Sequence, residues 1–153
     1  MGPIFERLVD FYKQIEWPMV QVPNEPILST TYQGNNGQSV VVVSADDHQQ
    51  NVAMFARAPR ACPPERHDAM AAFFTRINFG LLIGAWVIDT TDGEVRFRIG
   101  QDCKAIEPTF EVIKRMTLYT VMTMDHYIPA LEAVMKGEAT TQQAYELVFP
   151  PGN

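Results

Sequence analysis

The pair Asp125-His126 is the first candidate for chemistry, because a carboxylate and an imidazole together can carry general acid-base catalysis. Consecutive residues of a helix point about 100° apart, however, so these two side chains do not face each other. Asp125 stands where a helix that restarts before Pro129 needs an N-cap, and a carboxylate there accepts backbone hydrogen bonds. We therefore expect Asp125 to cap a helix and His126 to lie on the surface.

Cys62, His67 and Cys103 are residue types that bind metals. Zinc needs three or four ligands brought together, and the chain has neither a CxxC nor an HxH pair to begin such a site. The cluster at 46–48 (DDH) lacks the dense spacing of oxygen ligands that calcium requires and is typical of a turn between strands. The sequence therefore predicts no metal and no cofactor.

Gly80 and Gly84 do not belong to a phosphate-binding loop, since the chain has neither a GxxxxGK[ST] nor a GxGxxG motif. It also has no GxSxG nucleophile motif. Gly84 suits close packing at the start of a strand, and Gly80 suits the C′ position that ends a helix. Because no nucleophile, base and orienting group can be named together, we expect a protein without catalytic residues that is not an enzyme.

The composition is that of an ordinary globular protein, and the length fits a single domain spanning residues 1–153. Hydrophobic residues make up 46% of the chain and charged residues 20%, which argues against disorder. The net charge of −6 argues against a nucleic-acid partner, because a phosphate backbone is bound by basic surfaces.

Hydropathy and the number of cysteines indicate the cellular compartment of the protein. The longest uncharged apolar run, Phe79 to Ile88, is about half as long as the roughly 20 residues of a membrane-spanning helix. Glu6 and Asp10 interrupt the apolar residues of the N-terminus, which a secretory signal would keep uncharged. Two cysteines are too few for a disulfide scaffold. We expect a cytoplasmic protein without a membrane partner.

The spacing of apolar residues predicts the elements that position these candidates. Three-and-four spacing predicts helices, and β-rich runs bounded by turn residues predict strands. The turn of the first strand pair is either Asn35-Asn36 or Asn36-Gly37. The expected elements are helices at 4–15, 65–78, 109–136 and 140–148, with strands at 27–33, 40–45 and 52–58 and a hairpin within 79–99.

The hairpin follows from Asp92-Gly93, which forms a two-residue type I′ turn if both residues take positive φ. A slip of one residue would move every side chain to the other face, so the pattern constrains the register. The resulting pairs are Thr91 with Glu94, Asp89 with Arg96, Ile88 with Phe97 and Trp86 with Ile99.

The long helix contains Pro129, which cannot donate to the carbonyl of Asp125, so we expect a kink or restart between Met124 and Pro129. This helix also carries two apolar stripes, although one helix needs only one buried stripe. The second stripe either covers more of the sheet within the chain or forms an interface rich in methionine. Its members are Val112, Met116, Tyr119, Met122, Tyr127 and Val134.

Residues 78–84 (NFGLLIG), the turn at 92–94 (DGE) and residues 124–129 (MDHYIP) followed by Gly137 resemble the YbjN-like family, described as bacterial sensory transduction regulators. The resemblance covers about the second half of the chain, and the first half agrees in element order. It implies a fold similar to type III secretion chaperones and supplies no catalytic or ligand residues. The residues of the structural motif are Asn78, Gly80, Gly84, Asp89, Asp92, Gly93, Arg96, Asp125 and Pro129.

Together these observations predict an α+β fold, in which helices pack a five-stranded, mainly antiparallel sheet in the order α-βββ-α-ββ-α. The predicted function is a regulatory or chaperone-like module that binds a protein or peptide, and a homodimer is expected. The alternative is a small-ligand sensor with a pocket between sheet and helices. The residues expected to bind a partner are Met116, Tyr119, Met122, Tyr127 and Val134.

Overall fold

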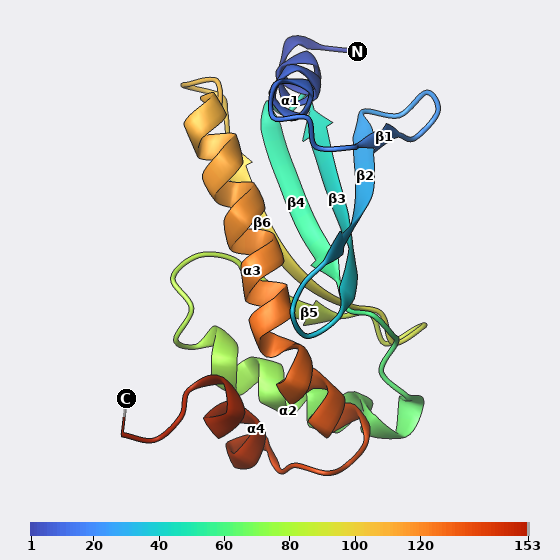
Figure 1. Ribbon diagram of the computed structural model, residues 1–153, viewed down its shortest axis with the longest axis vertical. Coiled ribbons are helices and arrows are strands. Elements are labelled where there is room, and N and C mark those ends of the chain that lie inside the picture. The colour runs from blue at the N-terminus through green and yellow to red at the C-terminus, as the bar shows by residue number, and fades with distance from the viewer. Residues whose placement is uncertain (153) are drawn as a thin grey trace.

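The computed structural model describes residues 1–152 and shows an antiparallel sheet with helices on one face and at one end (Figure 1). The α+β class expected from the sequence is confirmed. The elements are α1 (Pro3–Gln14), β1 (Val20–Gln21), β2 (Ile27–Gln33), β3 (Gln38–Asp46), β4 (Asn51–Arg57), the 3-10 helix η1 (Pro64–Arg66), α2 (His67–Asn78), β5 (Ala85–Ile88), β6 (Val95–Asp102), α3 (Phe110–Met135) and α4 (Thr141–Val148).

The sheet has six strands in the order β1-β2-β3-β4-β6-β5, so the expectation of five strands and of the order α-βββ-α-ββ-α was wrong. The extra strand, β1, pairs through Val20 and Gln21 with the start of β2. A strand of two residues carries no periodicity, and its pairing instead follows from a tight loop in which the Val22 amide donates to the Ile27 carbonyl.

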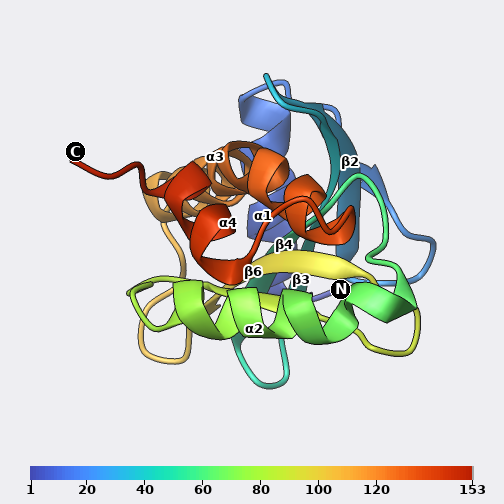
Figure 2. The same cartoon turned by 90° about the horizontal axis from the view of Figure 1, so that it is seen from below.

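Two hydrophobic clusters meet along α3. One joins α1 to the N-terminal half of α3 and to β2, β3 and β4, and the other joins α2, α4 and β5 to the C-terminal half of α3. Figure 2 shows α2 lying alongside α4 at one end of the molecule, where its side chains pack with those of α3 and α4 in the second cluster. Since α3 contributes to both clusters, it holds the two ends of the molecule together.

The hairpin between β5 and β6 has a wider loop than the sequence predicted. Gly93 has a φ of +80°, and its amide donates to the Asp89 carbonyl, which closes a four-residue loop at residues 90–93. The Asp89 carboxylate accepts hydrogen bonds from the amide and hydroxyl of Thr91, and these bonds lower the pKa of Asp89. The Asp92 carboxylate accepts from the Glu94 amide. These side-chain bonds favour the wider loop over a type I′ turn.

The wider loop shifts the ladder by two residues, so the predicted pairs were wrong. Trp86 lies opposite Phe97 and Ile88 opposite Val95, while Arg96 lies opposite Val87 and pairs with Glu94 rather than Asp89. A shift of two residues preserves the faces, because side chains alternate with a period of two. Trp86, Phe97 and Ile99 are therefore buried as expected, and Ile88 is half-buried.

Helix α3 runs unbroken through Pro129, so the helix does not restart between Met124 and Pro129. The Asp125 carbonyl, which Pro129 cannot reach with a hydrogen bond, accepts one from the side-chain amide of Asn36 at 3.0 Å. The Asp125 carboxylate does not cap a helix, because it accepts from the backbone amides of Asn35 and Asn36 at 3.1 and 2.8 Å. We call this set of three hydrogen bonds the Asp125 contact.

The Asp125 contact fixes the tip of the β2–β3 hairpin on the middle of α3. The turn is Asn35-Asn36, because Gln33 pairs with Gln38 and the Gly34 amide donates to the Gly37 carbonyl. Gly34 must lack a Cβ here, since that atom would overlap the Asp125 carboxylate. The sequence left this turn open between two alternatives, and the structure selects the first.

Helices α3 and α4 begin and end within one residue of the ranges expected from the sequence. Thr109 caps α3 and Thr140 caps α4, and Gly137 ends α3 with a φ of +70°. Gly80 does not adopt the left-handed conformation expected of a C′ glycine, because its amide donates to the Ile77 carbonyl within a turn. His126 lies on the surface, where its Nε2 is 3.1 Å from the Val148 carbonyl oxygen.

The Asp125 contact makes the cost of removing the Asn36 amide depend on residue 129. Asn36→Ala should lower the free energy of unfolding by about 1 kcal/mol in the wild-type chain. In a Pro129→Ala background the new backbone N–H can donate to the Asp125 carbonyl, so the same substitution should cost roughly half as much. Urea unfolding of the four variants measures this difference, and equal costs in both backgrounds would contradict the role given to Asn36.

Candidate functional site

An apolar groove runs beside α3 on the side of β6. It has a volume of about 530 Å³, and we call it the α3 groove. Ile99, Gly100 and Gln101 of β6 form one wall, and the segment between α2 and β5 closes one end. The lining residues are Leu82, Ile83, Gly84, Ile99, Gly100, Gln101, Val112, Arg115, Met116 and Tyr119.

Large apolar side chains project into solvent around this groove. Phe79 and Leu82 are 92% and 98% exposed on the α2–β5 loop, which bows outward beside α3 in Figure 1. Met122 on α3 is 62% exposed, and Leu118 and Tyr119 are partly exposed one turn earlier. A concentration of exposed apolar side chains around a groove is typical of an interaction surface.

The α2–β5 loop is held against α3 by specific contacts. The Tyr119 hydroxyl donates to the Ile83 carbonyl at 3.3 Å. Gly84 has a φ of +78°, and a Cβ there would overlap the Phe97 ring and lie 2.9 Å from the Arg98 carbonyl oxygen. Glycine therefore permits the chain to leave the sheet edge at this point and to present Leu82 and Ile83 beside the groove.

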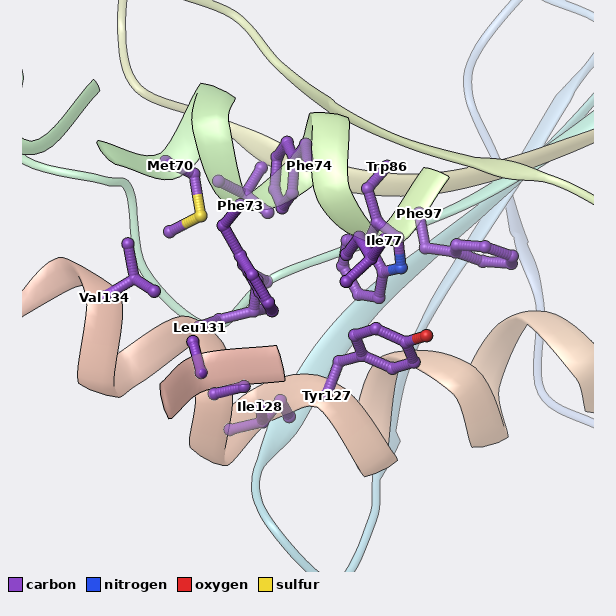
Figure 3. Packing of buried hydrophobic residues seen from close by; sticks show 14 of the residues in the cluster. Met70, Phe73, Phe74, Ile77, Trp86, Phe97, Tyr127, Ile128, Leu131 and Val134 are labelled. Atoms are coloured by element: carbon purple, nitrogen blue, oxygen red, sulfur yellow. The ribbon is translucent and has the colours of Figure 1, made fainter. Parts of the chain in front are cut away.

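The five residues expected to bind a partner are divided between the core and the surface. Tyr127 and Val134 are buried, and Figure 3 shows them among the side chains of α2 and β5. Met116 is also buried and contributes only the floor of the groove. Tyr119 and Met122 remain accessible. Most of the second apolar stripe is therefore used within the chain, because helices cover α3 on more than one side.

Tyr127 is packed against the indole of Trp86, with ring centroids 4.8 Å apart. Burial raises the pKa of Tyr127 to about 12, and the neighbouring Trp86 opposes this rise. The indole N–H of Trp86 has no hydrogen-bond partner of normal geometry within residues 1–152. Tyr127 thus stays protonated at neutral pH and acts as a core residue.

The edge of the sheet at β5 is closed by a side chain. The Asn78 amide group both donates to the Trp86 carbonyl and accepts from the Trp86 amide, each at 2.9 Å. These are the groups that a further strand would bind, so the last residue of α2 protects the edge. β5 pairs with Val95 to Arg98 of β6, so within residues 1–152 the segment from Ile99 to Asp102 pairs with β4 but has no strand on the groove side.

Residues with reactive side chains do not gather in the described part of the chain. Burial raises the pKa of both the Cys62 and the Cys103 thiol, which disfavours the nucleophilic thiolate. Residues 1–152 contain no group of three or more His, Cys, Asp or Glu side chains placed to hold a metal ion. No helix among these residues is both long enough and apolar enough to cross a membrane.

The α2–β5 loop is the part of the candidate site that sequence reasoning missed. Its apolar residues continue directly into β5, so they were counted as one apolar run. The signal that could have separated them is the pair Gly80 and Gly84, which brackets three large apolar residues between a helix and a strand.

The antiparallel sheet and the helices on one face define an α+β fold that a chain of a chaperone–effector complex shares. The chain belongs to the YbjN family. The family model, described as "Putative bacterial sensory transduction regulator", matches residues 5–133. No curated protein matches the chain.

Three solved structures share the fold at low sequence identity. YbjN from E. coli aligns with a TM-score of 0.70 and 16% identity over 88% of this chain and 94% of its own. A chain of the ExsC–ExsE complex aligns with a TM-score of 0.63 and 11% identity, over 82% of this chain and 91% of its own. A chain of the HopA1–SchA chaperone–effector complex aligns with a TM-score of 0.56 and 12% identity, over 82% and 94%. The small-ligand sensor is not supported by these findings.

The role of Asn78 predicts a local effect at Trp86. Asn78→Ala should lower the free energy of unfolding by about 2 kcal/mol, because it leaves a backbone donor and a backbone acceptor without partners. It should also speed hydrogen exchange of the Trp86 amide. Thr75→Ala, which removes a side-chain bond on the exposed side of α2, is the matched control. Unchanged exchange at Trp86 in the Asn78 variant would refute the edge-closing role.

Proposed function

We propose that this chain is a non-enzymatic, chaperone-like module that binds an apolar segment of another protein in the α3 groove. The observation that carries the proposal is the near-complete exposure of Phe79 and Leu82 on a loop that Tyr119 holds beside α3. Burial of apolar surface contributes about 25 cal/mol per Å², so these large exposed side chains represent a substantial binding free energy that the free chain does not gain. A partner that covers them recovers it.

The chemistry of the groove favours an extended apolar segment. Arg115 is the one charged residue among those that line the groove, and the other lining side chains are mainly aliphatic or aromatic. The C-terminal part of β6 also offers backbone groups along one wall, to which an extended chain can add hydrogen bonds. Successive side chains of an extended segment point in opposite directions, so every second side chain of the partner would contact the apolar floor of the groove.

The structural neighbours support a protein partner over a small ligand. One of them is part of a complex described as chaperone and effector, and another is part of the ExsC–ExsE complex. Their identity to this chain is 12% or less, so the partner of this chain must be established by experiment.

Substitutions at the rim of the groove test this proposal. Leu82→Asp combined with Met122→Lys places charges where a partner would bury apolar surface, and both residues are too exposed to disturb the core. Affinity capture from native lysate should lose the bound protein with this double variant. Val20→Asp on β1, 71% exposed at the opposite end of the strand order, is the control and should retain it. Equal recovery with both variants would contradict the proposal.

We also propose that the chain forms a homodimer, because half-buried apolar side chains remain on the sheet face that carries no helix. Light scattering coupled to size exclusion should give twice the 17.3 kDa mass of one chain. The Leu82→Asp and Met122→Lys double variant should keep that mass, since the α3 groove is reserved for another protein. A mass of one chain at every concentration would contradict the homodimer.

A further inference from the structure

The face of the sheet opposite the helices has an ordered arrangement of side chains. Burial alternates along β3, β4 and β6, so every second residue points to this outer face. The strand registers align these residues in rows that cross the sheet. One row consists of the small residues Ser44, Ala53 and Gly100, which are direct neighbours on β3, β4 and β6. The outer face is hollowed at this row, with a volume of about 470 Å³.

Charges of opposite sign lie at the two ends of this face. Arg57, Arg96 and Arg98 lie on one side of the small-residue row. Asp46 and Asp102 lie on the other side, in a row that passes through Asn51. On β6, Arg98 and Asp102 are each two residues from Gly100, so the small-residue row lies midway between these two charged residues.

Two of the three arginines already have a counterion. Arg57 and Arg96 are opposite each other on neighbouring strands, a repulsive arrangement that the Glu94 carboxylate relieves by pairing with both. The Arg96 guanidinium also lies 4.0 Å from the centre of the Phe55 ring. Arg98 and Asp102 form no ion pair within the described residues, and the Asp102 carboxylate accepts a hydrogen bond from the Lys104 amide.

We infer that the outer face of the sheet binds a second copy of this chain about a two-fold axis that runs along the row Ser44–Ala53–Gly100. A rotation about this axis reverses the strand direction and places Arg98 of each copy against Asp102 of the other, so the same ion pair forms twice. The inference rests on the proposed homodimer and names its interface.

The other residues of the face suit this arrangement. The small side chains along the axis on β3, β4 and β6 let the two sheets approach closely there, as in face-to-face sheet packing, while the half-buried Ile27 continues the row on β2. Val42 and Phe55 are half-buried within each chain and lie next to the axis, where the second copy would cover them. The α3 groove meets the hollow of the outer face at Gly84, Ile99 and Gly100, and the rest of the groove lies beside α3, away from the proposed dimer interface.

Charge reversal at the two ends of the face tests the inference. Arg98→Glu and Asp102→Lys should each weaken the dimer by at least about tenfold, because each opposes like charges twice across the axis. Mixing the two variants should restore a dimer that contains one Arg98→Glu chain and one Asp102→Lys chain. Gly100→Leu should also weaken the dimer while the monomer stays folded, since a Cβ at Gly100 comes no closer than 3.6 Å to the Val52 carbonyl oxygen.

Arg115→Glu is the matched control, because it makes the same change of charge in the α3 groove. Sedimentation equilibrium of all variants should show this control to be as dimeric as the wild type. A wild-type monomer would overturn the homodimer itself. A dimer that persists in Arg98→Glu, or that dissociates in Arg115→Glu, would leave the homodimer standing and overturn the interface inferred for it.

Discussion

Pro129 removes one hydrogen-bond donor from the middle of α3, and the rest of the structure depends on how the Asp125 carbonyl is satisfied. Asn36 supplies the missing donor from the tip of the β2–β3 hairpin. The helix is continuous for 26 residues and contributes side chains to both hydrophobic clusters. Since the Asp125 carboxylate also binds the hairpin backbone, one residue of α3 sets the position of the sheet on the helix.

The two surfaces with functional consequences follow from this placement. Helix α3 covers one face of the sheet, and its N-terminal half leaves a groove against β6 that the α2–β5 loop borders with exposed apolar side chains. The opposite face of the sheet carries no helix and presents separated charges about a row of small residues. We therefore propose another protein as the partner of the helix side and a second copy of the chain as the partner of the sheet side.

Local sequence signals predicted most of the elements, because caps, turn residues and apolar spacing act over a few residues. Helices α3 and α4 begin and end within one residue of their expected ranges. The hairpin register could not be predicted from Asp92-Gly93 alone, since side-chain bonds from Asp89 and Asp92 select a wider loop. The partner of the Asp125 carbonyl is Asn36, which lies in a distant part of the chain, so Pro129 by itself could not reveal this contact.

The candidate site was harder to predict than the fold. The second apolar stripe of α3 was recognised, but the sequence cannot show that α2 and α4 bury Tyr127 and Val134. Met122 and Tyr119 remain accessible, and the larger exposed residues come from the α2–β5 loop. Periodicity identifies an apolar stripe, whereas tertiary packing decides which part of it stays uncovered.

The central claim is that the surface around Leu82 and Met122 contacts another protein in the cell. The direct measurement is photocrosslinking in the native cell, with a photoreactive residue at Leu82, at Met122 or, as a control, at Val20. All three positions are at least 62% exposed. The account predicts a crosslinked product with a different protein from Leu82 and Met122 and none from Val20. The same products from all three positions, or no protein product from Leu82, would contradict it.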